Sequence, residues 1–168
     1  MPLAGFGELI GPETFDNTTL CGRYVGDAAL ANKIIQLTNR DETGGTFLYA
    51  VTIENHGPWP GGGKEGVSPL ENYKRHLESA DRMLSTLDGA FQTSRKRTLL
   101  VFFGDHQPSL PGVIAPAHST RTPYFIQEYS ARSPITQQHK DLTPAQLHQS
   151  IFDALTHSSN NNANFSQR

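Results

Sequence analysis

Two short, almost uninterrupted apolar runs constrain the fold of this chain most strongly. Residues 47–53 read Phe-Leu-Tyr-Ala-Val-Thr-Ile, and residues 99–103 read Leu-Leu-Val-Phe-Phe. Runs rich in β-branched and aromatic residues are typical of strands that are covered on both faces, as in a parallel sheet. The first run stops at a segment rich in proline and glycine, residues 57–63, and the second stops at Gly104. The sequence therefore predicts two buried, parallel strands.

Amphipathic patterns around these runs predict helices. Residues 27–38 carry apolar side chains at helical spacing, with Asp27 as the expected N-cap, and residues 69–91 repeat the pattern. Residues 123–129 predict a shorter edge strand, and residues 143–155 predict a last helix that begins with Thr-Pro. Helices alternating with strands, without two-residue hairpin turns, are typical of βαβ crossovers. The predicted fold class is α/β, a mostly parallel sheet of about three strands flanked by helices.

Length and composition predict one folded domain with two irregular ends. A chain of 168 residues is long enough for a hydrophobic core. We expect an irregular arm over residues 1–25, the folded domain over residues 26–157 and a disordered, Asn- and Ser-rich tail over residues 158–168. The sequence shows no secretory signal and no apolar stretch of the roughly 20 residues that a membrane span needs, so we expect the chain as written to be cytoplasmic.

Charge argues against a nucleic-acid partner, and cysteine content limits the covalent and metal chemistry of the chain. The formal net charge is −2, and the basic residues 95–97 form a short cluster rather than a stripe, so we expect no nucleic-acid partner. The one cysteine, Cys21, excludes an intramolecular disulfide and a multi-cysteine metal site.

The polar residues that follow the two strands are the candidates for chemistry. Ligands bind beyond the carboxyl ends of parallel strands, so His56 is expected to meet Asp105 and His106. Aspartate and histidine are good ligands for Zn²⁺ or Mn²⁺, and Gly104 permits a sharp turn there. The alternative for the Asp-His pair is a capping aspartate beside an exposed loop histidine. The convergence depends on the two strands being parallel.

These motifs resemble those of a known enzyme superfamily. Residues 47–59 are similar to its strand with an Asn-His-Gly-Pro-Trp end, residues 100–108 to its Gly-Asp-His metal strand, and residues 121–126 to a later Thr-Pro-Phe strand. The order and spacing of the motifs match from about residue 22 to residue 155. The chain thus resembles the C-terminal half of an alkaline-phosphatase/sulfatase enzyme. The most similar group contains lipoteichoic-acid synthases, phosphoglycerol transferases and related capsule or envelope polysaccharide enzymes.

The resemblance implies a metal and a catalytic histidine. Asp105 and His106 would be ligands of Mn²⁺ or Zn²⁺, with Mg²⁺ and Ca²⁺ as alternatives. His56 would be catalytic and would contact the phosphate or the leaving group of the substrate. The implied reaction is transfer or hydrolysis of a phosphate ester, in preference to a sulfate ester, in the synthesis of cell-envelope or capsular polysaccharide.

The resemblance also implies a substrate site and a cellular location. His56 would contact the substrate and Trp59 would shape the pocket wall, with packing as the alternative for Trp59. His118 and Arg121 are further substrate-binding candidates, because their loop is expected to return near the metal edge, with a solvated loop as the alternative. The substrate would be an envelope polysaccharide or a phospholipid-derived phosphoester. Full-length relatives would be anchored in the membrane with an extracytoplasmic catalytic domain. The other histidines, among them His76 on a predicted helix surface, are expected to serve no function in the site.

The sequence departs from the family at the nucleophile. The family uses a Thr or Ser nucleophile and further acidic ligands on earlier strands, and residues 1–46 contain no such motif. Thr14, Thr18 and Thr19 follow no apolar strand, so we assign none of them as the nucleophile. We therefore expect an incomplete, inactive fragment with its N-terminal strands missing and a raw sheet edge, and a separate chain that supplies the missing half is a candidate partner.

The residue types present also suggest three other interpretations. A calcineurin-like metallophosphoesterase would need a second aspartate after Gly-Asp, which this sequence lacks. A Ser-His-Asp hydrolase would need a Gly-x-Ser-x-Gly elbow, which is also absent. A non-catalytic, degenerate module that binds an envelope glycan or a partner protein stays open as the alternative function.

Overall fold

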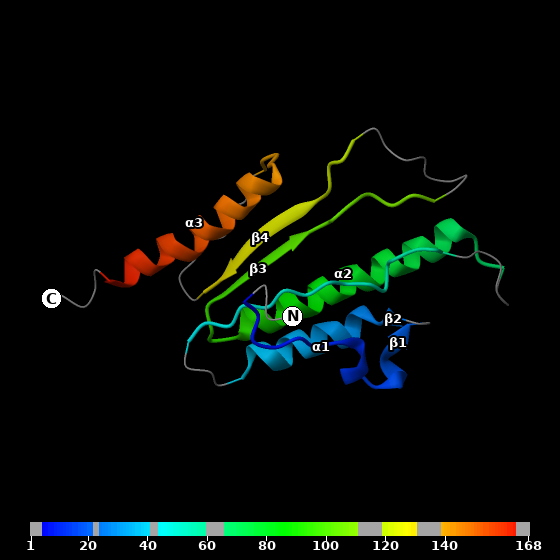
Figure 1. Ribbon diagram of the computed structural model, residues 1–168, viewed down its shortest axis with the longest axis horizontal. Helices are drawn as coiled ribbons and strands as arrows, with labels where there is room; N and C mark the ends of the chain where they lie inside the picture. The colour runs from blue at the N-terminus through cyan, green and yellow to red at the C-terminus, as the bar shows by residue number, and fades with distance from the viewer. Residues whose placement is uncertain are drawn as a thin grey trace. The chain divides into compact units, whose positions relative to one another are not determined.

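The computed structural model describes residues 5–21, 24–40, 44–59, 66–110, 119–130 and 139–163. Figure 1 shows the helices and strands along the chain. The chain divides into two compact units, which we describe separately. The N-terminal unit comprises Met1–Ala90 and Leu110–Ala115, and the C-terminal unit comprises Phe91–Ser109 and Pro116–Arg168.

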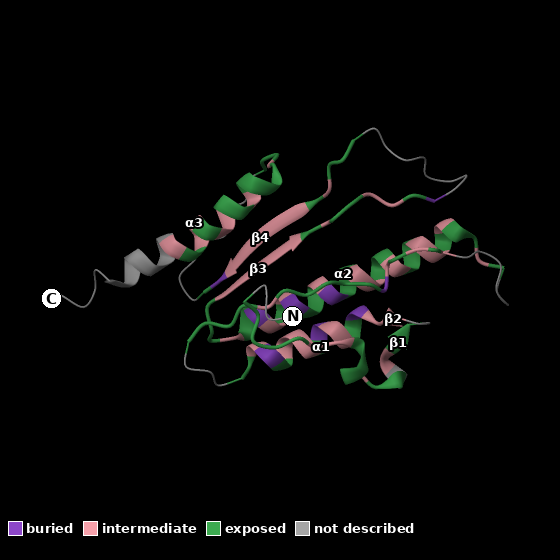
Figure 2. Cartoon of the chain, in the orientation of Figure 1, coloured by how far each residue is buried: buried purple, intermediate pink, exposed green. Residues whose placement is uncertain are grey.

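Two helices carry most of the core of the N-terminal unit. Helix α1 spans Asp27–Thr38, and helix α2 spans Pro69–Thr93, so both predicted helices are confirmed. Buried positions recur along each helix at the spacing of a single face (Figure 2). The buried apolar residues of this unit on the two helices are Ala31, Leu37, Met83 and Leu87.

Reciprocal capping interactions fix where two helices begin. At the start of α2, the Glu71 backbone N–H donates to Ser68 Oγ, and the Ser68 N–H donates to Glu71 Oε2. Thr143 and Gln146 repeat this arrangement at the start of the last helix, with Pro144 as its first residue. Each pair satisfies two backbone donors that the helix itself leaves without acceptors. The predicted Thr-Pro start of the last helix is therefore confirmed.

Short elements precede α1, where the sequence predicted an irregular arm. Strands β1 (Leu20–Cys21) and β2 (Tyr24–Val25) pair in the antiparallel direction. Two single 3₁₀ turns come before them, η2 (Pro12–Thr14) and η3 (Asn17–Thr19). The Gly26 N–H donates to Thr19 O, which connects the start of α1 to these turns.

Residues 47–53 do not form the predicted strand. They have no ladder partner among the described residues, and all of them except Leu48 are exposed, with Phe47 at 74%. The ring of Phe47 stacks on Phe6 at a centroid distance of 5.8 Å. The prediction of a buried strand here is wrong for this structure. The apolar run has strand composition, but a strand needs neighbours to satisfy its backbone, and no described segment provides them.

The C-terminal unit contains the second predicted strand. Strand β3 spans Thr98–Phe103 and pairs along its whole length with β4, Tyr124–Tyr129, in the antiparallel direction (Figure 1). The prediction of a mostly parallel sheet is therefore not confirmed. Both strand pairs among the described residues are antiparallel. The register of the ladder shows that β4 runs in the direction opposite to β3. The two strands are half-buried rather than fully covered.

Helix α3 (Pro144–Ala163) is joined to this strand pair through Arg97. The Arg97 Nη2 group donates to Ala154 O at 2.9 Å, and its Nε donates to Glu128 Oε1 at 2.7 Å. The helix continues past residue 158, where the sequence predicted a tail. Among the described helices, none combines the length and the hydropathy that crossing a bilayer would require.

Candidate functional site

The end of β3 and the start of β4 are joined by a close backbone contact at Gly104. The Gly104 N–H donates to Pro123 O at 3.0 Å, and Thr122 Oγ1 donates to Gly104 O at 2.6 Å. A Cβ atom at Gly104 would lie 3.1 Å from the Cβ of Thr122, so a glycine allows this approach without displacing its neighbour. The residues that follow β3 are thereby fixed beside those that precede β4.

The Asp105 carboxylate and the His106 imidazole converge directly after Gly104. Asp105 Oδ1 accepts the His106 backbone N–H at 2.8 Å, which orients the carboxylate, as the capping alternative expects. His106 Nδ1 lies 3.0 Å from Gln107 O, and a carbonyl only accepts, so Nδ1 carries the hydrogen. In the neutral ring, the lone pair is therefore on Nε2, which lies 3.5 Å from Asp105 Oδ2.

This separation fits a pair of metal ligands. Two acceptor atoms that face each other repel unless a proton or a metal ion lies between them. Zinc–nitrogen and zinc–oxygen bonds of about 2.0–2.2 Å place tetrahedral ligand atoms roughly 3.3–3.5 Å apart. The Oδ2–Nε2 distance of 3.5 Å in Asp105 and His106 agrees with that value. The two predicted ligands are therefore adjacent, exposed and correctly spaced to share a divalent ion.

Arg121 lies at the same end of the β3–β4 pair. Its backbone carbonyl accepts a hydrogen bond of 2.6 Å from the Gln107 side chain. Its guanidinium forms an exposed ion pair with Asp141, with 2.8 Å between Nη1 and Oδ2. A guanidinium has five N–H donors, so this pair leaves others for an anionic ligand. The other candidate of this region, His118, lies outside the described residues.

His56 and Trp59 belong to the N-terminal unit. His56 is exposed, and its Nδ1 lies 2.7 Å from Gly57 O, which leaves Nε2 as the ring's acceptor in the neutral form. The Trp59 ring packs edge-on against Tyr73 with centroids 5.1 Å apart. Its indole nitrogen is buried and has no hydrogen-bond partner among the described residues. Packing, the alternative role for Trp59, therefore describes its position in this unit.

The expected convergence of His56 with Asp105 and His106 stays a prediction. It was based on parallel pairing of residues 47–53 with the second strand, and the part of the chain that the structure describes contains no such pairing. His56 belongs to the N-terminal unit, and the Asp-His pair belongs to the C-terminal unit.

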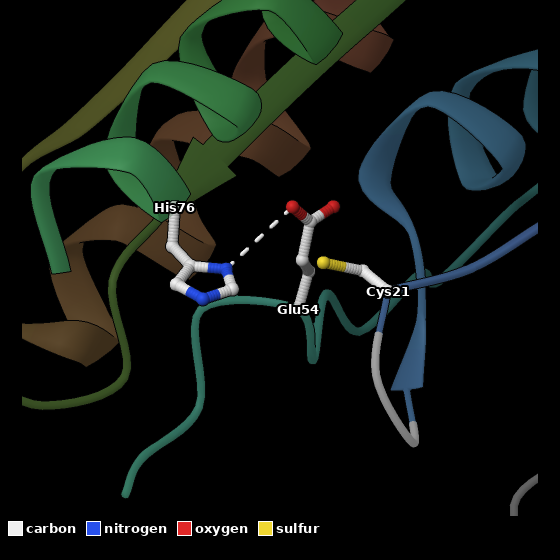
Figure 3. Close-up of side chains that lie close together, drawn as sticks. All are labelled: Cys21, Glu54 and His76. Atoms are coloured by element: carbon white, nitrogen blue, oxygen red, sulfur yellow. Dashed lines mark ion pairs between the residues drawn. The ribbon is translucent and has the colours of Figure 1, made fainter. Parts of the chain in front are cut away.

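A second cluster, which the sequence did not predict, lies within the N-terminal unit. Cys21 on β1, Glu54 in the turn after residue 53 and His76 on α2 point toward one another (Figure 3). One potential ligand atom from each lies within 4.8 Å of the other two. Glu54 Oε1 is 3.6 Å from His76 Nδ1. The prediction that His76 occupies a helix surface is wrong, because its side chain is largely buried beside Glu54.

The sequence carries a signal that His76 lies on the buried face of α2. It precedes Ala80, Met83 and Leu87 at intervals of four, seven and eleven residues, which places it on the buried face of α2. Leu77, which the pattern also allowed on that face, is 42% exposed. No local pattern marks Cys21 or Glu54 as its neighbours.

Glu54 also contacts the beginning of α1. Its Oε2 accepts the Asp27 backbone N–H at 2.6 Å, so a side chain distant in sequence satisfies this helix end. Asp27 is the first helical residue and Gly26 is the N-cap, which corrects the predicted N-cap. The Asp27 carboxyl is 1% exposed, and its oxygens have no hydrogen-bond partner among the described residues.

This arrangement perturbs two acidic groups. Burial, and then the negative charge of Glu54, raise the pKa of Asp27 from 3.8 to about 6. Partial desolvation, and then the charge of Glu54, raise the pKa of the Cys21 thiol. The carboxyl groups of Asp27 and Glu54 thus lie close together at a largely buried place.

The helices and the small antiparallel sheets are consistent with an α/β domain. The model of one protein family, described as Sulfatase, matches residues 2–157, so the chain belongs to the sulfatase family. The resemblance drawn from the sequence motifs is thereby confirmed at the level of the family.

Two relatives are much longer than this chain. The "Capsular polysaccharide biosynthesis protein RkpI" of Rhizobium meliloti is 34% identical over 129 residues, which cover 75% of this chain and 24% of that protein. An uncharacterized protein of Haemophilus influenzae is 23% identical over 107 residues, which cover 56% of this chain and 19% of that protein. The chain thus spans about a quarter or less of each relative. No solved structure matches.

Proposed function

We propose that this chain is part of a sulfatase-family enzyme that transfers or hydrolyses a phosphate ester, in preference to a sulfate ester, during synthesis of capsular or envelope polysaccharide. The substrate would be such a polysaccharide or a phospholipid-derived phosphoester. The family match over residues 2–157 and the similarity to RkpI support this assignment. The observation that carries it is the Asp105–His106 pair, whose acceptor atoms converge at 3.5 Å.

Asp105 and His106 are the residues that would hold the metal. Manganese or zinc fits an oxygen and nitrogen pair, with magnesium or calcium as alternatives. A bound ion supplies positive charge that polarises a phosphoryl oxygen. In the proposed site, the His106 backbone N–H donates to the Asp105 carboxylate and fixes it, and the Gln107 carbonyl fixes the imidazole with its Nε2 toward the ion.

Arg121 and His56 would act on the substrate. Arg121 lies at the same strand end as the ligand pair and has guanidinium donors for phosphate oxygens. His56 keeps Nε2 as an acceptor in its neutral form, which suits a group that receives or returns a proton at the phosphate or leaving group. Trp59 would contribute a wall of the substrate site beside His56.

A complete reaction would need further groups. Catalytic zinc sites have three protein ligands, and Asp105 and His106 provide two. We propose that the remaining ligands and the nucleophile come from sequence that corresponds to the rest of a protein such as RkpI, on the same polypeptide or on a separate chain. The 24% coverage of RkpI supports this proposal.

Metal binding tests the assignment directly. Titration calorimetry of the purified chain with Mn²⁺ and Zn²⁺ is expected to show binding that His106→Ala weakens by at least about 10-fold. His148→Ala, an exposed histidine on α3, is the matched control and should leave binding unchanged. Because Zn²⁺ also suits the Cys21, Glu54 and His76 cluster, the decisive titration uses Mn²⁺, which prefers oxygen-rich sites. Equal Mn²⁺ binding by the chain and by His106→Ala would contradict the proposed ligand pair.

A non-catalytic binding module is the second candidate. The exposed apolar side chains Phe47, Tyr49 and Val51 favour it, because such side chains are typical of association surfaces. Metal-dependent release of p-nitrophenol from a chromogenic phosphodiester by the chain plus the rest of a homologous enzyme would favour catalysis. Glycan binding without any turnover in that mixture would favour the module.

A further inference from the structure

We propose that Cys21, Glu54 and His76 form a zinc-binding site within the N-terminal unit. The site uses none of the residues assigned to phosphate-ester chemistry, and it is independent of the proposed function. Its three donors come from β1, from the turn after residue 53 and from α2, so a bound ion would connect three segments that are distant in sequence (Figure 3).

The set of donor atoms is specific for a metal of zinc's type. A thiolate sulfur, a carboxylate oxygen and an imidazole nitrogen are the three ligand classes that Zn²⁺ uses, whereas Mg²⁺, Ca²⁺ and Mn²⁺ prefer oxygen. The donors lie within 4.8 Å of one another. Zinc–sulfur bonds of about 2.3 Å and zinc–nitrogen bonds of about 2.0 Å require separations of roughly 3.3–3.8 Å. A side-chain movement of about 1 Å therefore closes the site.

The state of the His76 ring supports a ligand role. Its Nδ1 is buried and has no hydrogen-bond partner among the described residues. The nearest acidic atom is Glu54 Oε1 at 3.6 Å, which is too long for a hydrogen bond. A buried ring nitrogen that faces a buried carboxylate oxygen at this distance has the geometry of two ligands of one ion.

Asp27 gives an independent observation that a cation belongs here. Its carboxyl is 1% exposed, and both oxygens lack a hydrogen-bond partner among the described residues. Glu54 beside it is 7% exposed and contacts the Asp27 backbone N–H, the Cys21 thiol and His76. Two neighbouring buried carboxylates are costly unless a positive charge neutralises them.

A divalent ion on Glu54 would supply the compensating charge and would also hold the Cys21 thiol as a thiolate. Asp27 would then act as a charged neighbour of the ligand Glu54.

The proposed site would also fix the segment that carries His56. Glu54 precedes His56 by two residues, and the His56 N–H donates to Ile53 O at 3.0 Å within the same turn. A metal bond at Glu54 would therefore hold this turn against α2 through His76. Binding of metal to folded protein stabilises it, so zinc should stabilise this unit.

Zinc titration in an Asp105→Ala/His106→Ala background tests the site without interference from the other pair. Competition with a chromophoric zinc chelator is expected to show one equivalent of tightly bound Zn²⁺. Cys21→Ser and His76→Gln should each lower that affinity by more than the roughly 10–100-fold that loss of an outer-shell partner costs. His148→Gln, on the exposed side of α3, is the matched control and should change nothing.

Cobalt gives a readout that a purely structural effect would not change. The Co²⁺-loaded background protein should show a thiolate-to-cobalt charge-transfer band in the near ultraviolet, and Cys21→Ser should abolish it. Cys21 is exposed, so this variant is expected to keep its fold, which circular dichroism checks. Absence of the band, or unchanged zinc affinity in folded Cys21→Ser protein, would overturn the proposal.

Discussion

The two candidate metal sites of this chain differ in how they are built. Asp105 and His106 are consecutive, follow one strand and are 82% and 71% exposed. Cys21, Glu54 and His76 come from three separate segments, and the two last are largely buried. The first site is readable as a motif because the chain itself holds its residues together. The second exists only after β1, the turn at Glu54 and α2 have come together.

Substitutions at buried positions of α2, the helix that carries His76, should have the largest effect on the free energy of unfolding. Leu87→Ala removes a side chain that is 2% exposed, and we expect a loss of about 2–5 kcal/mol in the free energy of unfolding. Leu77→Ala, at a position that is 42% exposed, should cost less than about 1 kcal/mol. Urea denaturation of both variants measures the difference.

Equal losses for these two leucine variants would mean that α2 does not bury the face that carries His76. His76 would then face solvent together with Leu77, and the cluster of Cys21, Glu54 and His76 would not be a buried site.

Zinc should stabilise the chain through the buried cluster and not through the exposed pair. At a free zinc concentration 100 times the dissociation constant, the expected gain is about 2.7 kcal/mol. For a protein of this size that corresponds to a rise in Tm of roughly 5–10 °C. Differential scanning calorimetry measures it, and excess chelator should reverse it.

The rise in Tm should persist in Asp105→Ala/His106→Ala protein and disappear in Cys21→Ser protein. The opposite pattern would assign the stabilising ion to the strand-end pair, and would show that the exposed motif binds metal more strongly than the dispersed cluster.

The charge of Asp27 should destabilise metal-free protein at neutral pH. Because folding raises the pKa of Asp27 from 3.8 to about 6, the folded protein binds more protons than the unfolded chain between these values. The stability due to this group is therefore fully present below about pH 4 and is lost as the pH rises to about 6.

In chelator-treated protein at pH 7.5, Asp27→Asn should therefore raise the free energy of unfolding by an amount on the order of 2 kcal/mol. The same variant should gain little at pH 4, where the wild-type carboxyl is already protonated. Denaturation at the two pH values checks this, and an equal gain at both would show that the carboxylate charge is not the cause. With zinc present the gain should shrink, because the ion compensates the same charge.

Much of the helical framework could be predicted from sequence. The apolar spacing of α1 and α2 and the Thr-Pro start of α3 are local signals, and the structure confirms the helices they predict. The strand pairing could not be predicted in the same way. Residues 47–53 have strand composition, but whether they pair depends on neighbours elsewhere in the chain, and the described residues provide none.

The same distinction applies to the sites. Gly104, Asp105 and His106 were readable because they are adjacent, whereas Cys21 and Glu54 carry no local sign that they meet His76. Asp27 was expected to cap α1 with its own side chain, and only the fold shows that Glu54 accepts its N–H. Local chemistry was thus predictable to the extent that the interacting groups are neighbours in sequence.

The smallest effect on stability should come from the exposed pair. Asp105→Asn and His106→Ala change strongly exposed side chains, and each should alter the free energy of unfolding by no more than about 0.5 kcal/mol. Each should nevertheless weaken Mn²⁺ binding by at least about 10-fold, because the Oδ2–Nε2 pair supplies the ligands. Urea denaturation and calorimetry on the same samples separate the two quantities. A large loss of stability without any loss of Mn²⁺ affinity would show that Asp105 and His106 are structural residues and not metal ligands. Asp105 would then act only as the cap of the turn at the end of β3, through its 2.8 Å contact with the His106 N–H.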